Sequence, residues 1–178
     1  QELTQEQVVF SGSFDDDVSQ AITTLPITMG GEPHTSLFIS TNGFITLSSA
    51  PSATNYDPMS TGISAPVVAA LATNLEGIDA TSKVSYSIGF YQGIIIQWKN
   101  VRRVGYPGES LSFQVRLESF SYGNILPAAK IIYGPFQGVA APTTPVHVGI
   151  RVGSGSAPDS YNAITVADGS SWTSAALG

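Results

Sequence analysis

Residues 37–47, Leu-Phe-Ile-Ser-Thr-Asn-Gly-Phe-Ile-Thr-Leu, decide the fold of this chain. Apolar residues recur at every second position on both sides of the centre: Leu37 and Ile39 before it, Ile45 and Leu47 after it. This period of two is typical of β-strands that bury one face. Asn42-Gly43 separates the two runs. Because both residue types tolerate a positive φ, the pair predicts the tight turn of a β-hairpin.

The same alternation recurs along the chain, between clusters of Gly, Pro, Asn and Ser. It is clearest over residues 111–118, where Leu, Phe, Val and Leu face one side and Ser, Gln, Arg and Glu face the other. Pro26 cannot donate a ladder hydrogen bond, so the strand around it should lie at a sheet edge or break there. Further strands are expected at residues 7–10, 21–29, 83–88, 94–101, 111–120, 125–133, 146–152 and 161–166.

Two segments are ambiguous or irregular. Residues 65–75 are rich in Ala and carry Pro66 near their start, which suits a helix, but they are short and lie among strands. We therefore expect a buried strand of small residues. Residues 48–64 are rich in Ser, Pro, Ala and Thr and lack a helical period, so we expect a surface loop.

Together these segments predict an all-β fold, an antiparallel β-sandwich or jelly roll of about nine to eleven strands. The 178 residues fit one domain, expected to span residues 1–178. Within it, residues 1–12 would form an extended N-terminal strand and residues 167–178 a C-terminal tail.

The amino-acid composition limits the partners and the cellular location to be expected. Charged residues make up 11% of the chain, the net charge is −6, and there is no cysteine. Seven scattered cations predict no nucleic-acid partner. No apolar run approaches the ~20 residues that span a bilayer, which predicts no membrane insertion. The first residue, Gln1, is what signal-peptide removal would leave, so we expect an exported protein that is extracellular or on the cell surface.

Several segments carry a family resemblance. The hairpin is similar to the S-x-N-G-F-(I/V)-x-(L/F) hairpin of β-sandwich domains in secreted and cell-surface proteins of Bacteroidetes type, substrates of the type IX secretion system. The nidogen-like extracellular domain carries a similar hairpin. Other segments resemble parts of these domains in the same order: residues 15–19, 63–71, 95–101, 112–117 and 148–150.

The resemblance implies an extracellular, non-enzymatic module with no shared catalytic residue. One segment departs from the pattern, because residues 70–74 read Ala-Leu-Ala-Thr-Asn where family members often have Trp and Asp. Any role of that acidic position in a metal site or in folding is therefore in doubt here.

Residues with side chains suited to chemistry are few. Asp15, Asp16 and Asp17 form the only acidic run, and crowded carboxylates can bind Ca²⁺, although no EF-hand loop follows. The alternative is a solvated acidic turn. His34 and His147 are the only histidines and lie outside any catalytic motif. We therefore expect no enzyme and no cofactor, with calcium as the one metal candidate.

Two kinds of partner fit the remaining signals. Tyr56 and Tyr106 lie in expected loops, where aromatic rings can stack on the sugars of a surface glycan. Alternatively, the N-terminal strand at residues 2–10 could pair with a sheet edge of another copy and build a surface filament by strand exchange. Equally, it could be the first strand of its own sandwich. A structural or adhesive module is the leading prediction, and a carbohydrate-binding module using loop aromatics is the alternative.

Overall fold

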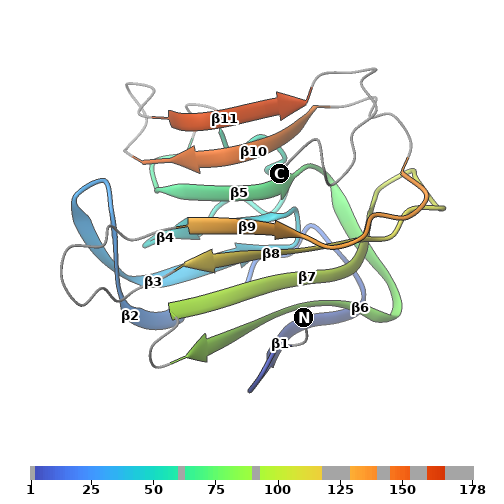
Figure 1. Cartoon of the computed structure of the whole chain (residues 1–178), viewed down its shortest axis with the longest axis horizontal. Coiled ribbons are helices and arrows are strands. Elements are labelled where there is room, and N and C mark those ends of the chain that lie inside the picture. Colours follow the sequence, from blue (N-terminus) through green and yellow to red (C-terminus); the bar gives the residue numbers. More distant parts are fainter. Residues whose placement is uncertain are drawn as a thin grey trace.

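The computed structural model describes residues 3–59, 63–89, 93–117, 129–139, 145–152 and 160–166. These residues form eleven strands in two antiparallel sheets that pack face to face (Figure 1). No helix occurs among them. The predicted all-β sandwich is confirmed, and the strand number falls within the predicted range.

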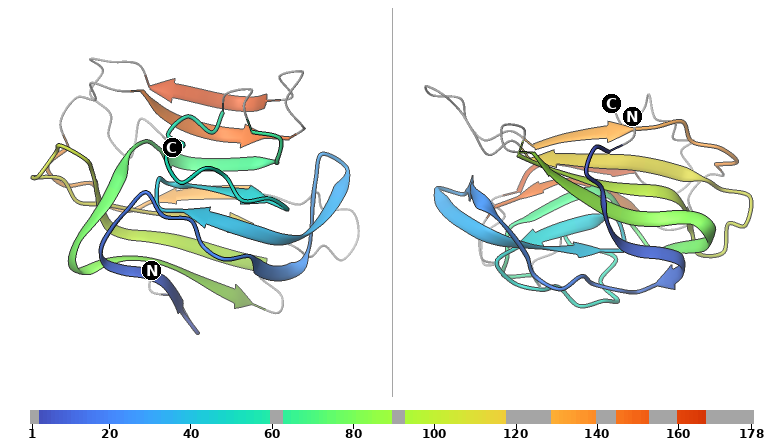
Figure 2. Two further views of the ribbon diagram at one scale, coloured as in Figure 1. Left: turned by 180° about the vertical axis from the view of Figure 1, so that it is seen from behind. Right: turned by 90° about the horizontal axis from the view of Figure 1, so that it is seen from below.

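Each sheet combines strands that are distant in sequence (Figure 2). The five-stranded sheet has the order β1-β6-β7-β8-β9, with bounds Gln7–Asp15, Leu75–Gly89, Gly93–Arg103, Leu111–Leu117 and Ala129–Tyr133. The six-stranded sheet has the order β11-β10-β5-β4-β3-β2, with bounds Ser160–Val166, Val146–Arg151, Val67–Ala72, Phe44–Leu47, Glu32–Ser40 and Ile22–Met29.

The opening hairpin forms, but its turn differs from the one expected. Ser40 pairs with Phe44, so three residues, not two, connect β3 to β4. Gly43 has φ +81°, the left-handed position that closes a three-residue loop, whereas Asn42 does not have a positive φ. The prediction that Asn42 adopts a positive φ in a two-residue turn was therefore wrong. Asn42 is needed in this loop for the hydrogen bonds of its side chain.

The main core lies between the sheets. The inward residues of the hairpin are fully buried there, as their alternation predicted: Leu37, Ile39, Ile45 and Leu47. Trp98 from the facing sheet stacks on Phe113, with ring centroids 5.1 Å apart. Its Nε1 donates to the carbonyl oxygen of Ser40 at 3.0 Å, so one buried side chain joins the two sheets by both packing and a hydrogen bond.

A second apolar cluster covers the outer face of the six-stranded sheet. Within the expected segment 65–75, Val67–Ala72 do form a strand, β5, and all six of its residues are buried. Met59, Ile63 and Ala65 pack on this face, so residues 48–59 and 63–66 are more than a surface loop. Arg151 from β10 is 3% exposed and donates to the carbonyl oxygens of Pro58 and Ile63, which fixes the segment to the sheet.

Strand β2 behaves as Pro26 predicted. It lies at the edge of the six-stranded sheet, and its register with β3 is interrupted between Thr23 and Ile27. A two-residue turn at Gly30 and Gly31, with φ +65° and +84°, connects it to β3. This turn has the left-handed backbone that we had expected at Asn42.

Replacing Gly43 with Ala should lower the free energy of unfolding by about 3 kcal/mol or more, because the left-handed backbone resists a side chain and the core resists added volume. The new Cβ would lie 2.3 Å from the carbonyl oxygen of Leu71. Urea unfolding measures the change. Gly31→Ala is the matched control: its φ is similar but nothing lies within 4 Å, so a loss of only about 1 kcal/mol is expected. Equal losses would contradict the close approach.

Candidate functional site

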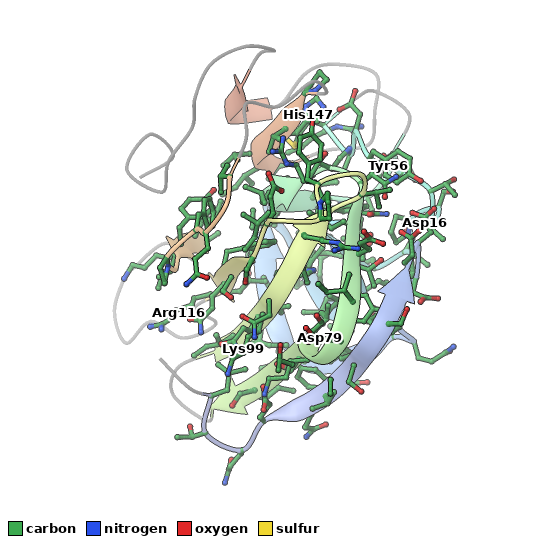
Figure 3. All side chains as sticks on the ribbon, turned by 90° about the vertical axis from the view of Figure 1, so that its right-hand side faces the viewer. Asp16, Tyr56, Asp79, Lys99, Arg116 and His147 are labelled. Carbon is green, nitrogen blue, oxygen red and sulfur yellow. The ribbon has the colours of Figure 1, made fainter. Side chains whose placement is uncertain are left out.

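Three polar side chains from separate segments meet at one end of the sandwich. Asn42, in the hairpin loop, is fully buried, and its Nδ2 donates to Asp16 Oδ1 and to the carbonyl oxygen of Ala53, each at 3.0 Å. Its Oδ1 accepts the backbone N–H of Leu75 at 2.9 Å. Tyr56 Oη donates to the other oxygen of Asp16 at 2.8 Å. Figure 3 shows Asp16 and Tyr56 side by side at this end.

Tyr56 is held as a neutral donor. The hydrogen bond to the Asp16 carboxylate, with burial and the charges of Asp16 and Asp15, raises the pKa of Tyr56 to about 12. The phenol therefore keeps its proton at neutral pH and continues to donate to Asp16. One predicted ligand-binding residue and one predicted metal ligand thus contact each other, and both oxygens of Asp16 accept neutral donors.

The three aspartates have different roles. Asp16 has φ +40°, which turns the chain sharply after β1. Asp17 contributes its backbone, exchanging hydrogen bonds with Thr41. Burial, with the charge of Asp16, raises the pKa of Asp15 above 3.8. Within the described ranges, no three carboxylates or histidines are grouped so that they could hold a metal ion. The arrangement of Asp15–Asp17 therefore does not support the calcium hypothesis.

Tyr106 belongs to a different cluster. The guanidinium carbon of Arg103 lies 3.9 Å from the centre of its ring, so a cation covers one ring face. Arg103 also pairs with Glu109, and both side chains are almost fully buried. The loop between β7 and β8 is thereby held by a buried ion pair that the sequence did not indicate, since Glu109 lies in no recognisable motif.

The two histidines lie on separate strands. Nδ1 of His147, on β10, is 3.5 Å from Asp57 Oδ1. His34, on β3, contacts Ser48 Oγ through Nδ1 at 2.7 Å and the carbonyl oxygen of Met29 through Nε2 at 3.3 Å. Ser48 is exposed, and the second partner of His34 is the carbonyl oxygen of Met29 and not a carboxylate. The arrangement lacks the enclosed, carboxylate-oriented histidine of a serine hydrolase.

Exposed apolar side chains are aliphatic. The large ones in the described part of the chain are Val8, Leu25, Ile78, Ile88, Val104 and Ile132. A sugar-stacking platform needs exposed aromatic faces, and the described residues present none at that level of exposure. Tyr56 and Tyr106 are half-buried, and binding of a glycan through them stays a prediction.

Two open cavities complete the surface. One, of about 600 Å³, lies between the edge strands of the two sheets and is lined by residues of β1, of β2 and of the connection between them, with Tyr86. The other, of about 610 Å³, lies on the outer face of β7, β8 and β9. Neither cavity could be predicted from the sequence. Each forms between strands that are neighbours only in the folded sheet, and local sequence patterns do not encode that order.

Asn42→Ala should lower the free energy of unfolding by about 3 kcal/mol, because three hydrogen-bond partners lose a buried amide. Chemical denaturation measures the loss. Asn55→Ala is the control, since its Oδ1 accepts one exposed local bond from the N–H of Asp57, and it should cost well under 1 kcal/mol. Similar losses in both variants would show that the amide of Asn42 does not join these segments.

Charge at Asp15 should have a measurable pH signature. Because its native pKa is raised, the folded state holds the proton more tightly than the unfolded state, and stability falls as pH rises from below 3.8 through the native pKa. Asp15→Asn should therefore stabilise the protein at neutral pH and have little effect well below 3.8.

Asp79 is the control of opposite sign. Hydrogen bonds from the hydroxyl and N–H of Thr81, each 2.7 Å, lower its pKa, so its contribution is present above 3.8 and is lost as pH falls. Asp79→Asn should destabilise the protein at neutral pH. Thermal unfolding across pH separates the two, and the same sign in both variants would refute the assignment.

Comparison with known proteins identifies one family. The model of the family described as NIDO related matches residues 1–176. Comparisons with curated proteins and with solved structures find no match. The described residues contain no helix long and apolar enough to cross a membrane. The predicted nidogen-like similarity is confirmed, and it supports an extracellular structural module.

Proposed function

Because the chain belongs to the NIDO-related family, we propose that it is a non-enzymatic structural or adhesive module whose copies assemble through strand β1. In this proposal the protein is exported by a signal peptide and acts at the cell surface or in an extracellular filament. The observation that carries the proposal is the open side of the sandwich, where the edge strands of both sheets border one cavity.

Strand β1 has the properties of a joining element. It pairs with β6 of its own chain along one side and lies at the edge of its sheet. Its sequence, Gln-Val-Val-Phe-Ser-Gly-Ser-Phe-Asp, contains no Lys and no Pro, the residues that commonly protect sheet edges. Val8 is 54% exposed and lines the cavity together with Phe10 and Ile22. An apolar side chain at an open edge favours burial against another chain.

The opposite edge of the cavity is less suited to pairing. Strand β2 contains Pro26, which has no backbone N–H to donate to an added strand. β1 is therefore the better candidate. Strand exchange would remake between copies the pairs that β1 now makes with β6 in one chain, so exchange costs little beyond association itself.

A non-enzymatic role agrees with the surroundings of the titratable groups. His34 on β3 contacts the exposed Ser48, and His147 on β10 contacts Asp57. Neither histidine lines either of the two large cavities. The carbohydrate-binding alternative that uses Tyr56 and Tyr106 has no observation in its favour, since Tyr56 is hydrogen-bonded to Asp16 and Tyr106 is covered by Arg103.

A disulfide lock tests assembly by strand exchange. Ser13 of β1 and Ile78 of β6 are paired and exposed, and the chain has no cysteine. In the Ser13→Cys, Ile78→Cys variant, an intramolecular bond should keep the protein monomeric, and reduction should restore the assembly of the unmodified chain. Light scattering and electron microscopy follow assembly, and non-reducing electrophoresis reports which chains are joined.

Two results decide the outcome. Covalent ladders formed when the variant is oxidised after assembly would support exchange of β1 between copies. An unmodified protein that stays monomeric at high concentration would overturn the proposal. Val8→Lys is a second variant that tests assembly without an engineered disulfide. It should suppress assembly because a charge at a sheet edge opposes pairing.

A further inference from the structure

We infer that the cavity on the outer face of the five-stranded sheet is a binding site for an acidic oligosaccharide, a hydroxyl-rich chain bearing carboxylates. This site is separate from the β1 edge and does not depend on assembly. Its lining comes mainly from the outward-facing residues of β7 and β8, and residues 132–135 border it on one side. Figure 3 shows Lys99 and Arg116 on this side of the molecule, away from Asp16 and Tyr56.

Positive charge is concentrated on this face although the chain carries a net charge of −6. Residues paired across neighbouring strands point to the same face. Lys83 pairs with Lys99, and Arg116 pairs with Lys130, which places four of the seven cations on one face of one sheet. Such a field attracts anions.

Among the described residues, Glu6 is an acid on this face that already has hydrogen-bond partners. Glu6, from the segment before β1, accepts hydrogen bonds from Lys83 at 2.5 Å and Ser85 at 2.6 Å. Burial would raise its pKa, but these bonds and the charges of Lys83 and Lys99 hold the pKa of Glu6 below 4.5. Glu6 thus pairs with Lys83 over β6, outside the cavity, and its charge also interacts with that of Lys99, which lines the cavity together with Arg116.

A pair of amides forms the floor between these cations. Gln114 Nε2 donates to Gln97 Oε1 at 2.6 Å, and Gln114 Oε1 accepts from Nε and Nη2 of Arg116 at 3.3 and 3.0 Å. Both glutamines are less than one-tenth exposed. Sequence alternation had placed Gln114 on a wet face. It faces outward as expected, but it is buried in this ordered polar network.

The network selects a ligand by its chemistry. Backbone groups in the middle of a sheet are used by the ladder, so recognition here must use side chains. In the described part of the chain, Gln97 Nε2 has no hydrogen-bond partner, and it can donate to a hydroxyl. Guanidinium and ammonium groups bind carboxylates. A strand-adding peptide would use the backbone of the edge strand β9, whereas the charged and amide side chains of the cavity lie on β7 and β8, whose backbone groups are used by the ladder.

The spacing requires a chain and not a single sugar. Gln97 pairs with Gln114, Lys99 lies two residues beyond Gln97, and Arg116 lies two residues beyond Gln114 in the opposite direction. At ~3.3 Å per residue, the two cations are separated by roughly 13 Å along the strands. A ligand that contacts both must extend across the amide floor. Affinity should therefore rise from the monosaccharide to a short oligomer and then level off.

Calorimetric titration with oligogalacturonate tests the site against its methyl ester, which keeps the hydroxyls but removes the charges. The acid should bind, and the ester should bind at least about tenfold more weakly, as expected for loss of charged hydrogen bonds. Arg116→Gln should weaken binding about tenfold by the same reasoning. Arg102→Gln is the matched control, because it removes one charge beside Glu76 outside the cavity and should leave affinity within about twofold.

The Gln97→Leu variant distinguishes specific binding through the amide pair from non-specific attraction to a charged surface. It changes no charge, so it should weaken oligogalacturonate binding while leaving weak, salt-sensitive binding of polyglutamate unchanged. Equal binding of acid and ester, no binding of either, or polyglutamate binding as tight as the sugar would each overturn the inference. The acid–ester comparison uses the unmodified chain, so the test stands even where a variant folds poorly.

Discussion

The carboxamide of Asn42 is the interaction on which the organisation of this sandwich depends. From one buried position it contacts the acidic turn after β1, the segment after β4 and the start of β6. These segments belong to different parts of the sequence and to both sheets. Each bond is individually modest, but leaving any of the partners unsatisfied in the interior would cost more than the bond contributes. The amide therefore specifies which loops lie together.

Sequence periodicity predicted most of the strands because alternation follows directly from which face is buried, but it missed residues 76–82 at the start of β6. The hairpin core, the edge position of β2 and the strand of small residues at β5 all follow from local pattern. Polar networks are different, since they depend on which strands become neighbours. The contacts of Asn42 with Asp16, of Gln97 with Gln114 and of Arg103 with Glu109 each required strand or loop placement that no local pattern encodes.

The predicted site residues illustrate the same limit. Tyr56 and Asp16 were selected for different reasons, one as a sugar contact and one as a metal ligand, and they bind each other. Residues with unusual chemistry in a loop often satisfy one another, because buried polar groups need partners. The amide donor without a partner among the described residues, Gln97 Nε2, instead lies on a strand face, where Gln and Arg in an alternating pattern had suggested ordinary solvent exposure.

Small side chains on β5 have a mechanical consequence. Ala69 and Ala72 lie under the segment that contains Met59, Ile63 and Ala65, and that segment continues from Tyr56. Their size sets the height at which it rests on the sheet. A larger side chain at either position would need space that this segment now fills. The small residues of β5 therefore serve the segment that covers the sheet as well as the sheet itself.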